Sequence, residues 1–85
     1  MTLSHSDIEA FKTLPSPPDL TDDNFYRFKL QRYRSKCFLD AVKKDLLIEG
    51  HPKADLLLSI AWSNGHAGGY HEVYREAMEL VELLR

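Results

Sequence analysis

The segment that determines the fold of this chain is Ala61-Trp62-Ser63-Asn64-Gly65-His66-Ala67-Gly68-Gly69-Tyr70-His71-Glu72-Val73. This segment holds three of the four glycines, two of the four histidines and the only tryptophan. Apolar residues recur at helical spacing on both sides of it. Because glycines permit sharp turns and close approach, a glycine-rich segment between two helical patterns predicts a tight corner between helices.

The two helices that meet at this corner are predicted over 53–63 and 70–84. The first has its apolar stripe at Ala54, Leu57, Leu58, Ala61 and Trp62. The second has its stripe at Tyr70, Val73, Ala77, Leu80, Val81 and Leu84, with an acidic face of Glu72, Glu76, Glu79 and Glu82. Asn64-Gly65 is typical of a helix C-cap with a positive φ at the glycine, and Gly68-Gly69 is expected to let the helices approach closely.

A long helix is predicted before this hairpin. Thr21-Asp22-Asp23-Asn24 is an N-cap signal with acids in the first turn, and no glycine or proline follows until Gly50-His51-Pro52. Its apolar stripe is expected at Tyr26, Leu30, Tyr33, Cys37, Ala41 and Ile48, flanked by Phe38, Val42 and Leu46. Gly50 is then expected at the C′ position that ends the helix.

The length of this helix leads to an expectation about assembly. About 28 residues at 1.5 Å each span ~42 Å. A compact chain of this size has a diameter of about 30 Å. The helix must therefore break, protrude or pack against another copy of the chain; we favour the last, which predicts a homo-oligomeric bundle.

The N-terminal residues predict a short helix and a connector. Ser6-Asp7-Ile8-Glu9 has the form of a capping box, with Ser6 as the N-cap. Leu14-Pro15-Ser16-Pro17-Pro18 ends that helix, because proline lacks an amide hydrogen and disfavours α at the preceding residue. A disordered tail over 1–18 is the alternative. The predicted fold class is all-α, with residues 1–20 as helix and connector and 21–85 as one helical domain.

Composition restricts the class of protein. Eighty-five residues suffice for one domain, and the single cysteine, Cys37, excludes an internal disulfide. The N-terminus lacks the basic and apolar regions of a secretory signal, and no apolar run approaches the roughly 18 residues of a membrane span. We expect a cytoplasmic protein that does not contact membranes.

Charge is unevenly distributed although the net charge is only −2. Residues 25–44 hold seven Lys and Arg against one Asp, while the segments on both sides are acidic. The cations Arg27, Lys29, Arg32, Arg34 and Lys36 alternate with aromatic residues. Phosphate contact combined with base stacking requires this mixture, so 27–44 is a candidate face for a nucleic acid, a nucleotide or another anionic ligand. The alternative is that these cations pair with the glutamates of the last helix.

The corner is the second candidate binding surface, through His66, Gly68, Gly69, Tyr70, His71 and Glu72. Free amides at a helix N-terminus attract anions, and the histidines flank that position. The lysine and the Ser or Thr of a phosphate-binding loop are missing. A purely structural corner therefore stays open as the alternative.

Catalysis and metal binding find no support in the local patterns. His71 and Glu72 point about 100° apart on a helix, so together with His66 they do not form a metal site. Cys37 lies on an apolar stripe, and no Ser, His and acid form a nucleophile elbow. We predict no cofactor, no metal and no enzymatic activity.

The C-terminal 35 residues resemble small proteins of tailed bacteriophages. The resemblance rests on His51-Pro52-Lys53-Ala54, on the segment from Ala61 to Val73 and on Leu80-Val81-Glu82-Leu83-Leu84. It implies a short accessory or inhibitor protein that binds a host macromolecule, with a host protein as the expected partner. A second resemblance, to a tetratricopeptide-type helix pair, rests on Gly68, Tyr70, Val73 and Ala77 and implies only a helical hairpin.

Overall fold

The computed structural model describes residues 3–20 and 24–85, and over these residues the chain is all-α. Its four helices are α1 (His5–Ala10), α2 (Tyr26–Asp45), α3 (Ala54–Gly65) and α4 (Tyr70–Glu82), with short 3₁₀ turns at Phe11–Thr13 and His66–Gly68. The described residues contain no strand. The predicted fold class, one long helix before a C-terminal hairpin, is confirmed. None of the described helices combines the length and the apolar character needed to cross a membrane.

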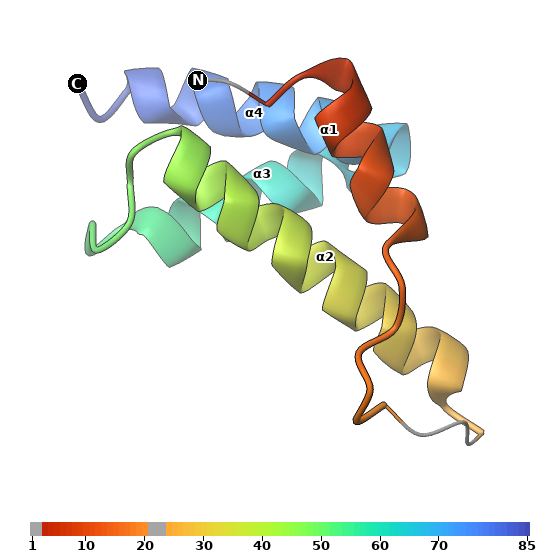
Figure 1. The fold of residues 1–85 in the computed structure, drawn as a ribbon. Helices are drawn as coiled ribbons and strands as arrows, with labels where there is room; N and C mark the ends of the chain where they lie inside the picture. The colour runs from red at the N-terminus through yellow and green to blue at the C-terminus, as the bar shows by residue number, and fades with distance from the viewer. Residues whose placement is uncertain (1–2, 21–23) are drawn as a thin grey trace.

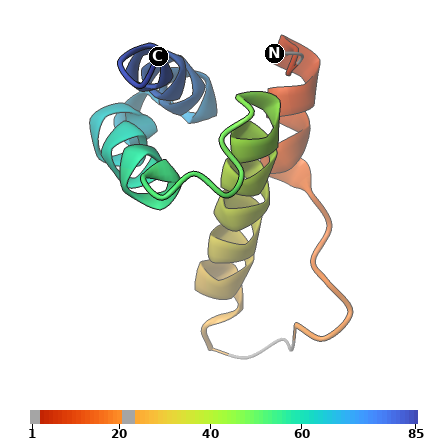
Figure 2. The ribbon, with the colours of Figure 1, turned by 90° about the vertical axis from the view of Figure 1, so that its left-hand side faces the viewer.

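The helices form two unequal parts. α3 and α4 lie antiparallel as a hairpin, and the carboxyl-terminal half of α2 crosses it (Figure 1). α1 packs beside α2 and α4. The amino-terminal half of α2 extends beyond the hairpin and has the connector 14–20 along its other side (Figure 2). One half of α2 is therefore part of the core, and the other half has room for contacts outside the bundle.

The core lies where all four helices meet. Its most deeply buried side chains on α2 are Phe38 and Val42, which we expected to flank the apolar stripe rather than to form its centre. The other helices contribute Ile8 from α1, Leu57, Leu58 and Ala61 from α3, and Val73, Ala77 and Val81 from α4. Each large apolar side chain buried here contributes about 1.5–3 kcal/mol.

The carboxyl-terminal end of α2 differs from the prediction. The helix ends at Asp45 rather than at Glu49, and Leu47, with φ 60°, takes the left-handed C′ position that was expected for Gly50; Gly50 has a positive φ of 78° further along the loop. The Ile48 amide donates to the Lys43 carbonyl and the Leu47 amide to the Lys44 carbonyl, which makes a Schellman motif. This turn buries Ile48, and that burial offsets the strain of a left-handed leucine.

The shorter helix removes the reason for expecting an oligomer. α2 has 20 residues, about 30 Å in length, and the longest extent of the molecule is 44 Å. The helix therefore fits within one chain. Homo-oligomeric association stays a prediction without that argument.

The N-terminal segment folds back onto the helices. The N-cap of α1 is Ser4, whose hydroxyl accepts from the Asp7 amide while the Asp7 carboxylate accepts from the Ser4 amide. The predicted box at Ser6 is therefore displaced by two residues. This register buries Ile8 and leaves the Glu9 side chain free to reach α4. The predicted N-cap at Thr21-Asp22-Asp23 lies outside the described residues, and Phe25, without a side-chain cap bond, is the N-cap of α2.

Asp45 joins three parts of the fold at the end of α2. Its carboxylate accepts hydrogen bonds from the Tyr74 hydroxyl of α4 and from the Leu3 amide, the latter at 3.2 Å. Burial, together with the hydrogen bond to Asp45, raises the pKa of Tyr74 to about 12. The neutral phenol of Tyr74 on α4 therefore donates to the Asp45 carboxylate on α2, and this hydrogen bond links the hairpin to the long helix.

Candidate functional site

Two glycines shape the corner, each for a different reason. Gly65 is the last residue of α3, and a Cβ there would lie 2.8 Å from the backbone carbon of Glu72 and the amide nitrogen of Val73. Its φ is −115°, so the predicted positive φ at Asn64-Gly65 is wrong and close approach of the two helices is what requires glycine. The positive φ, +91°, belongs to Gly69, the N-cap of α4. A Cβ at Gly68 would meet only the flexible side chain of Glu72.

The polar side chains of the corner are engaged within the chain. His66 donates from Nδ1 to the Trp62 carbonyl at 2.9 Å and stacks on the indole, with the ring centroids 5.9 Å apart. Tyr70 stacks on Phe38 at 4.3 Å, and its hydroxyl lies 3.3 Å from Ser35 Oγ. Of these predicted binding residues, His66 is exposed and Tyr70 is half-buried.

His71 has its partners on α1, and Glu72 has its partner on α4 itself. His71 Nε2 donates to Glu9 Oε1 at 2.7 Å, and its ring stacks on His5 at 4.1 Å. Glu72 accepts from both Nε and Nη2 of Arg75. Hydrogen bonding to His71 lowers the pKa of Glu9, and hydrogen bonding to Arg75 lowers that of Glu72. The corner residues thus hold helices together, and whether they also bind a partner stays a prediction.

The five cations proposed for α2 do not share one role. Arg34 donates from Nε to the Leu14 carbonyl at 2.8 Å and so holds the connector. Lys36 pairs with Asp40 at 3.3 Å on an exposed turn. Arg27 and Arg32 are exposed, and Lys29 is half-buried. The glutamates of α4 pair locally instead of with α2: Glu72, Glu76 and Glu79 with Arg75, and Glu82 with Arg85.

Aromatic and basic side chains gather in a hollow at the amino-terminal half of α2. It is lined by three aromatic residues and three cations: Phe25, Phe28, Lys29, Arg32, Tyr33 and Lys36. Phe25 and Phe28 are 65% and 60% exposed. The guanidinium of Arg32 lies over the Phe28 ring, 5.9 Å from its centroid. Exposed phenylalanines carry a free-energy cost in water that a bound partner would relieve.

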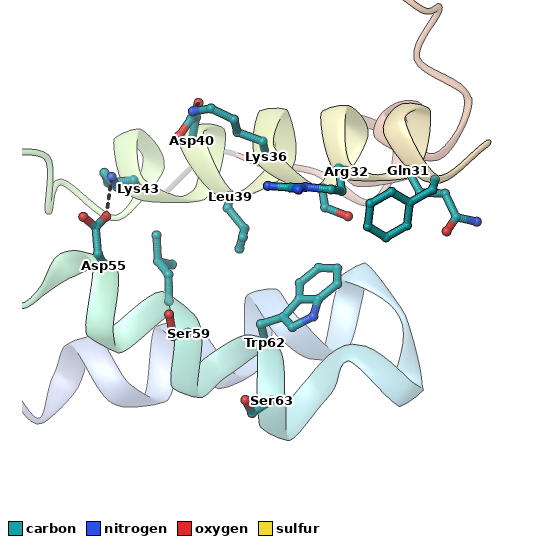
Figure 3. A pocket seen from close by; sticks show the side chains of 13 residues that line it. Gln31, Arg32, Lys36, Leu39, Asp40, Lys43, Asp55, Ser59, Trp62 and Ser63 are labelled. Carbon is teal, nitrogen blue, oxygen red and sulfur yellow. Dashed lines mark hydrogen bonds and ion pairs between the residues drawn. The ribbon is translucent and has the colours of Figure 1, made fainter. Parts of the chain in front are cut away.

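A groove of about 770 Å³ continues from this hollow between α2 and α3. Leu39 and Trp62 point into it from opposite helices, with Gln31 and Arg32 at one end (Figure 3). At the other end Lys43 Nζ donates to Asp55 Oδ1 at 2.9 Å (Figure 3). This hydrogen bond raises the pKa of Lys43 and lowers that of Asp55, so the bridge is charged at neutral pH. The wall is mainly apolar, and the charges lie at its rim.

The sequence missed Trp62 as a site residue because its spacing placed it on the buried stripe of α3. The tryptophan is half-buried, and it lines the groove. Periodicity identifies the face of α3 that meets other helices, but it does not say where α2 leaves that face uncovered. The apolar wall of the groove can anchor an apolar side chain of a ligand, and the cations at its rim can pair with an anionic group.

Comparisons with known proteins place the chain in a family but do not indicate its function. A search of curated proteins found no match, and a search of solved structures found none either. Residues 20–85, which hold α2, α3, α4 and the whole groove, match the model of a family described as "Family of unknown function (DUF8546)", and the chain therefore belongs to that family.

Proposed function

We propose that this protein is a non-catalytic binding protein and that the groove between α2 and α3 takes an amphipathic helical segment of a partner protein. The observation that carries the proposal is the pairing of Leu39 and Trp62 across the groove beside the exposed Phe28. Three large apolar side chains on two rigid helices form the kind of cluster that anchors a helix.

The charges at the rim favour an acidic segment. Arg32 and Lys36 stand beside the apolar wall, and both are exposed. Their positions suit carboxylates that flank the apolar face of a docked helix. The exposed Lys36–Asp40 pair costs little to break, because ion pairs in water contribute at most about 1 kcal/mol.

We propose that the partner is a host protein, because the C-terminal residues resemble small proteins of tailed bacteriophages. An accessory or inhibitor protein made in an infected cell meets host proteins in the cytoplasm. The partner is then a host protein with an exposed acidic helix. An oligomer of this chain is compatible with such binding, because the groove lies within one chain.

A second candidate function rests on the hollow at the amino-terminal half of α2. Among the residues that the structure describes, its lining consists of three cations and three aromatic residues, without a carboxylate. Single-stranded nucleic acids bind to this combination, with phosphates near the cations and bases stacked on the rings. The hollow and the groove share Phe28, Arg32 and Lys36, so one set of variants tests both candidates.

The experiment places a photo-crosslinking amino acid at Trp62, and in a second protein at Leu56, which is 61% exposed on α3 and does not line the groove. After irradiation in bacterial lysate, a cross-linked protein found from Trp62 and not from Leu56 supports the proposal. It should disappear in Phe28→Ala and in the double variant Arg32→Glu, Lys36→Glu. Lys44→Glu, an exposed charge reversal on α2 outside the groove, is the control.

Three outcomes would count against the groove as the binding site of a partner protein. Equal capture from Trp62 and Leu56 means that the groove is not the site. Tight binding of a fluorescent oligothymidine that weakens steeply with salt and is lost in the Arg32→Glu, Lys36→Glu variant favours nucleic acid instead. Loss of the partner in His66→Ala, with the groove variants unaffected, would assign binding to the exposed part of the corner.

A further inference from the structure

Three potential metal ligands meet on the side of the molecule away from the groove. His5 and Glu9 stand four residues apart on α1, so their side chains share one face of that helix. His71, in the first turn of α4, reaches the same point. One ligand atom from each of the three lies within 4.8 Å of the others. Among residues 3–20 and 24–85 this is the one such group.

The fold holds two of these ligands in place. Ile8, which precedes Glu9 on α1, is 3% exposed, so the helix is anchored in the core next to Glu9. The Glu9 carboxylate meets His71 Nε2 at 2.7 Å, and the half-buried His71 ring has the His5 ring stacked against it. His5 is the mobile member, because its side chain is 80% exposed and its Nε2 lies 3.8 Å from the Glu9 oxygen.

We propose that His5, Glu9 and His71 bind a divalent transition-metal ion such as Zn²⁺ and thereby clamp α1 to α4. Tetrahedral metal–ligand bonds of about 2.0–2.2 Å place neighbouring ligand atoms roughly 3.3–3.6 Å apart. The two separations from the Glu9 oxygen, 2.7 and 3.8 Å, bracket that range. A rotation of the exposed His5 ring out of its stack is the main movement required. Two imidazoles and one carboxylate favour Zn²⁺ and similar ions over Mg²⁺ or Ca²⁺.

Lys12 supplies an independent test of this assignment. Its Nζ pairs with the same Glu9 oxygen at 3.2 Å, one turn along α1. In the metal-bound site the Glu9 carboxylate binds the metal ion. The ion then replaces the two groups that contact this carboxylate in the metal-free protein, the Lys12 ammonium and the Nε2–H of His71. Lys12 thus opposes metal binding both by occupying the ligand and by repelling the cation. Lys12→Gln is expected to bind the metal several-fold more tightly than the unaltered protein.

The site also has a structural consequence. A metal held by both helices binds the folded protein and not the unfolded chain, so it raises the melting temperature. With Zn²⁺ in large excess over its Kd, the rise is expected to exceed about 5 °C. Two of the three ligands, His5 and Glu9, lie outside the residues that match the family. The clamp is therefore a property of this chain's N-terminal segment.

The experiment uses the full chain after treatment with a chelator. Zn²⁺ alone is titrated by calorimetry, and the melting temperature is followed in parallel. We expect saturable binding of one ion per chain, at least tenfold weaker in each of His5→Ala, Glu9→Gln and His71→Ala. His51→Ala and His66→Ala remove exposed histidines elsewhere and are expected to bind as the unaltered protein does.

The variants also separate metal binding from folding. His71→Ala and Glu9→Gln remove a contact between α1 and α4, whereas His5 is exposed and its replacement leaves the hydrogen bond between the other two intact. The proposal is overturned if the unaltered chain shows no saturable binding, or if His5→Ala binds Zn²⁺ as tightly as the unaltered chain. It is equally overturned if His51→Ala or His66→Ala abolishes binding, or if Lys12→Gln weakens it.

Discussion

The corner at residues 65–72 and the segment 25–36, at the amino-terminal end of α2, differ in how their side chains are packed. Both combine aromatic rings with charged or ionisable side chains. In the corner those side chains contact other helices: Tyr70 stacks on Phe38, and His71 meets Glu9. In the amino-terminal half of α2, Phe25 and Phe28 are mostly exposed. Residue type alone therefore does not distinguish side chains that pack between helices from side chains that remain exposed.

The difference comes from where the helices end. The hairpin spans only part of α2, so the first half of α2 lies beyond it (Figure 2). In the corner, Tyr70 packs against α2 and His71 against α1, so both side chains have partners within the fold. Side chains of the extended half face the connector on one side and solvent or the groove on the other. The following changes test this contrast.

The largest effect is expected at the closest approach of the corner. Gly65→Ala places a methyl group 2.8 Å from backbone atoms of α4, which cannot move without opening the hairpin. Overpacking of this kind costs about 3 kcal/mol in the free energy of unfolding. Urea denaturation followed by circular dichroism measures it. Gly68→Ala is the matched control, because there the methyl meets a flexible Glu72 side chain; equal losses for both variants would contradict the account of the corner.

The second effect concerns the bond between the hairpin and α2. Tyr74→Phe removes the hydrogen bond to Asp45 and is expected to cost about 2 kcal/mol at neutral pH, as bonds to charged groups do. Guanidinium denaturation of the two proteins gives the difference in the free energy of unfolding. Tyr33→Phe, a half-buried tyrosine of α2 outside the hairpin, is the control and is expected to cost less.

The same bond makes stability depend on alkaline pH. The pKa of Tyr74 is about 12 in the folded protein and about 10 in the unfolded chain. Its contribution is therefore complete below about pH 10, decreases as pH rises above that value, and is lost as pH passes about 12. Tyr74→Phe should flatten this decline. An unchanged decline would mean that other groups cause it.

The third effect lies in the loop between the two parts. Leu47→Gly relieves a left-handed leucine that is 84% exposed, and we expect a gain of about 1 kcal/mol in the free energy of unfolding. Gly50→Ala, at φ +78° with open space around its Cα, is expected to lose about as much. Thermal denaturation of both variants checks the opposite signs. A loss at Leu47→Gly would show that its side chain packs favourably.

The smallest effect on stability is expected in the extended half of α2. Phe28→Ala should change the free energy of unfolding by less than about 0.5 kcal/mol, because the ring is mostly exposed. Tyr70→Ala, which removes a ring stacked on the buried Phe38, should cost several times more. Urea denaturation of both proteins measures the ratio. Similar losses would remove the distinction between the two regions.

Periodicity and glycine placement predicted the all-α class and the hairpin, because both depend on neighbours along the chain. Helix ends were harder to predict. The end of α2 was expected at Gly50, yet the chain leaves the helix at Leu47, because that turn buries Ile48. A favourable long-range contact thus outweighed the local preference for glycine. The predicted cap at Ser6 moved to Ser4 as α1 took the register that buries Ile8.

The candidate sites depended on tertiary structure more than the helices did. The mixture of cations and aromatic residues in the sequence marked Arg32, Lys36 and Phe28 as part of a candidate binding face. That Trp62 lines the same groove follows only from the packing of α3 opposite α2. His71 and Glu9 are 62 residues apart in sequence, and no local pattern connects them. The sequence by itself determined the helices and the corner, since backbone sterics and side-chain spacing act within a few residues. The groove and the His5–Glu9–His71 cluster were decided by packing, because the burial of Ile8, Phe38 and Val42 brings distant side chains together.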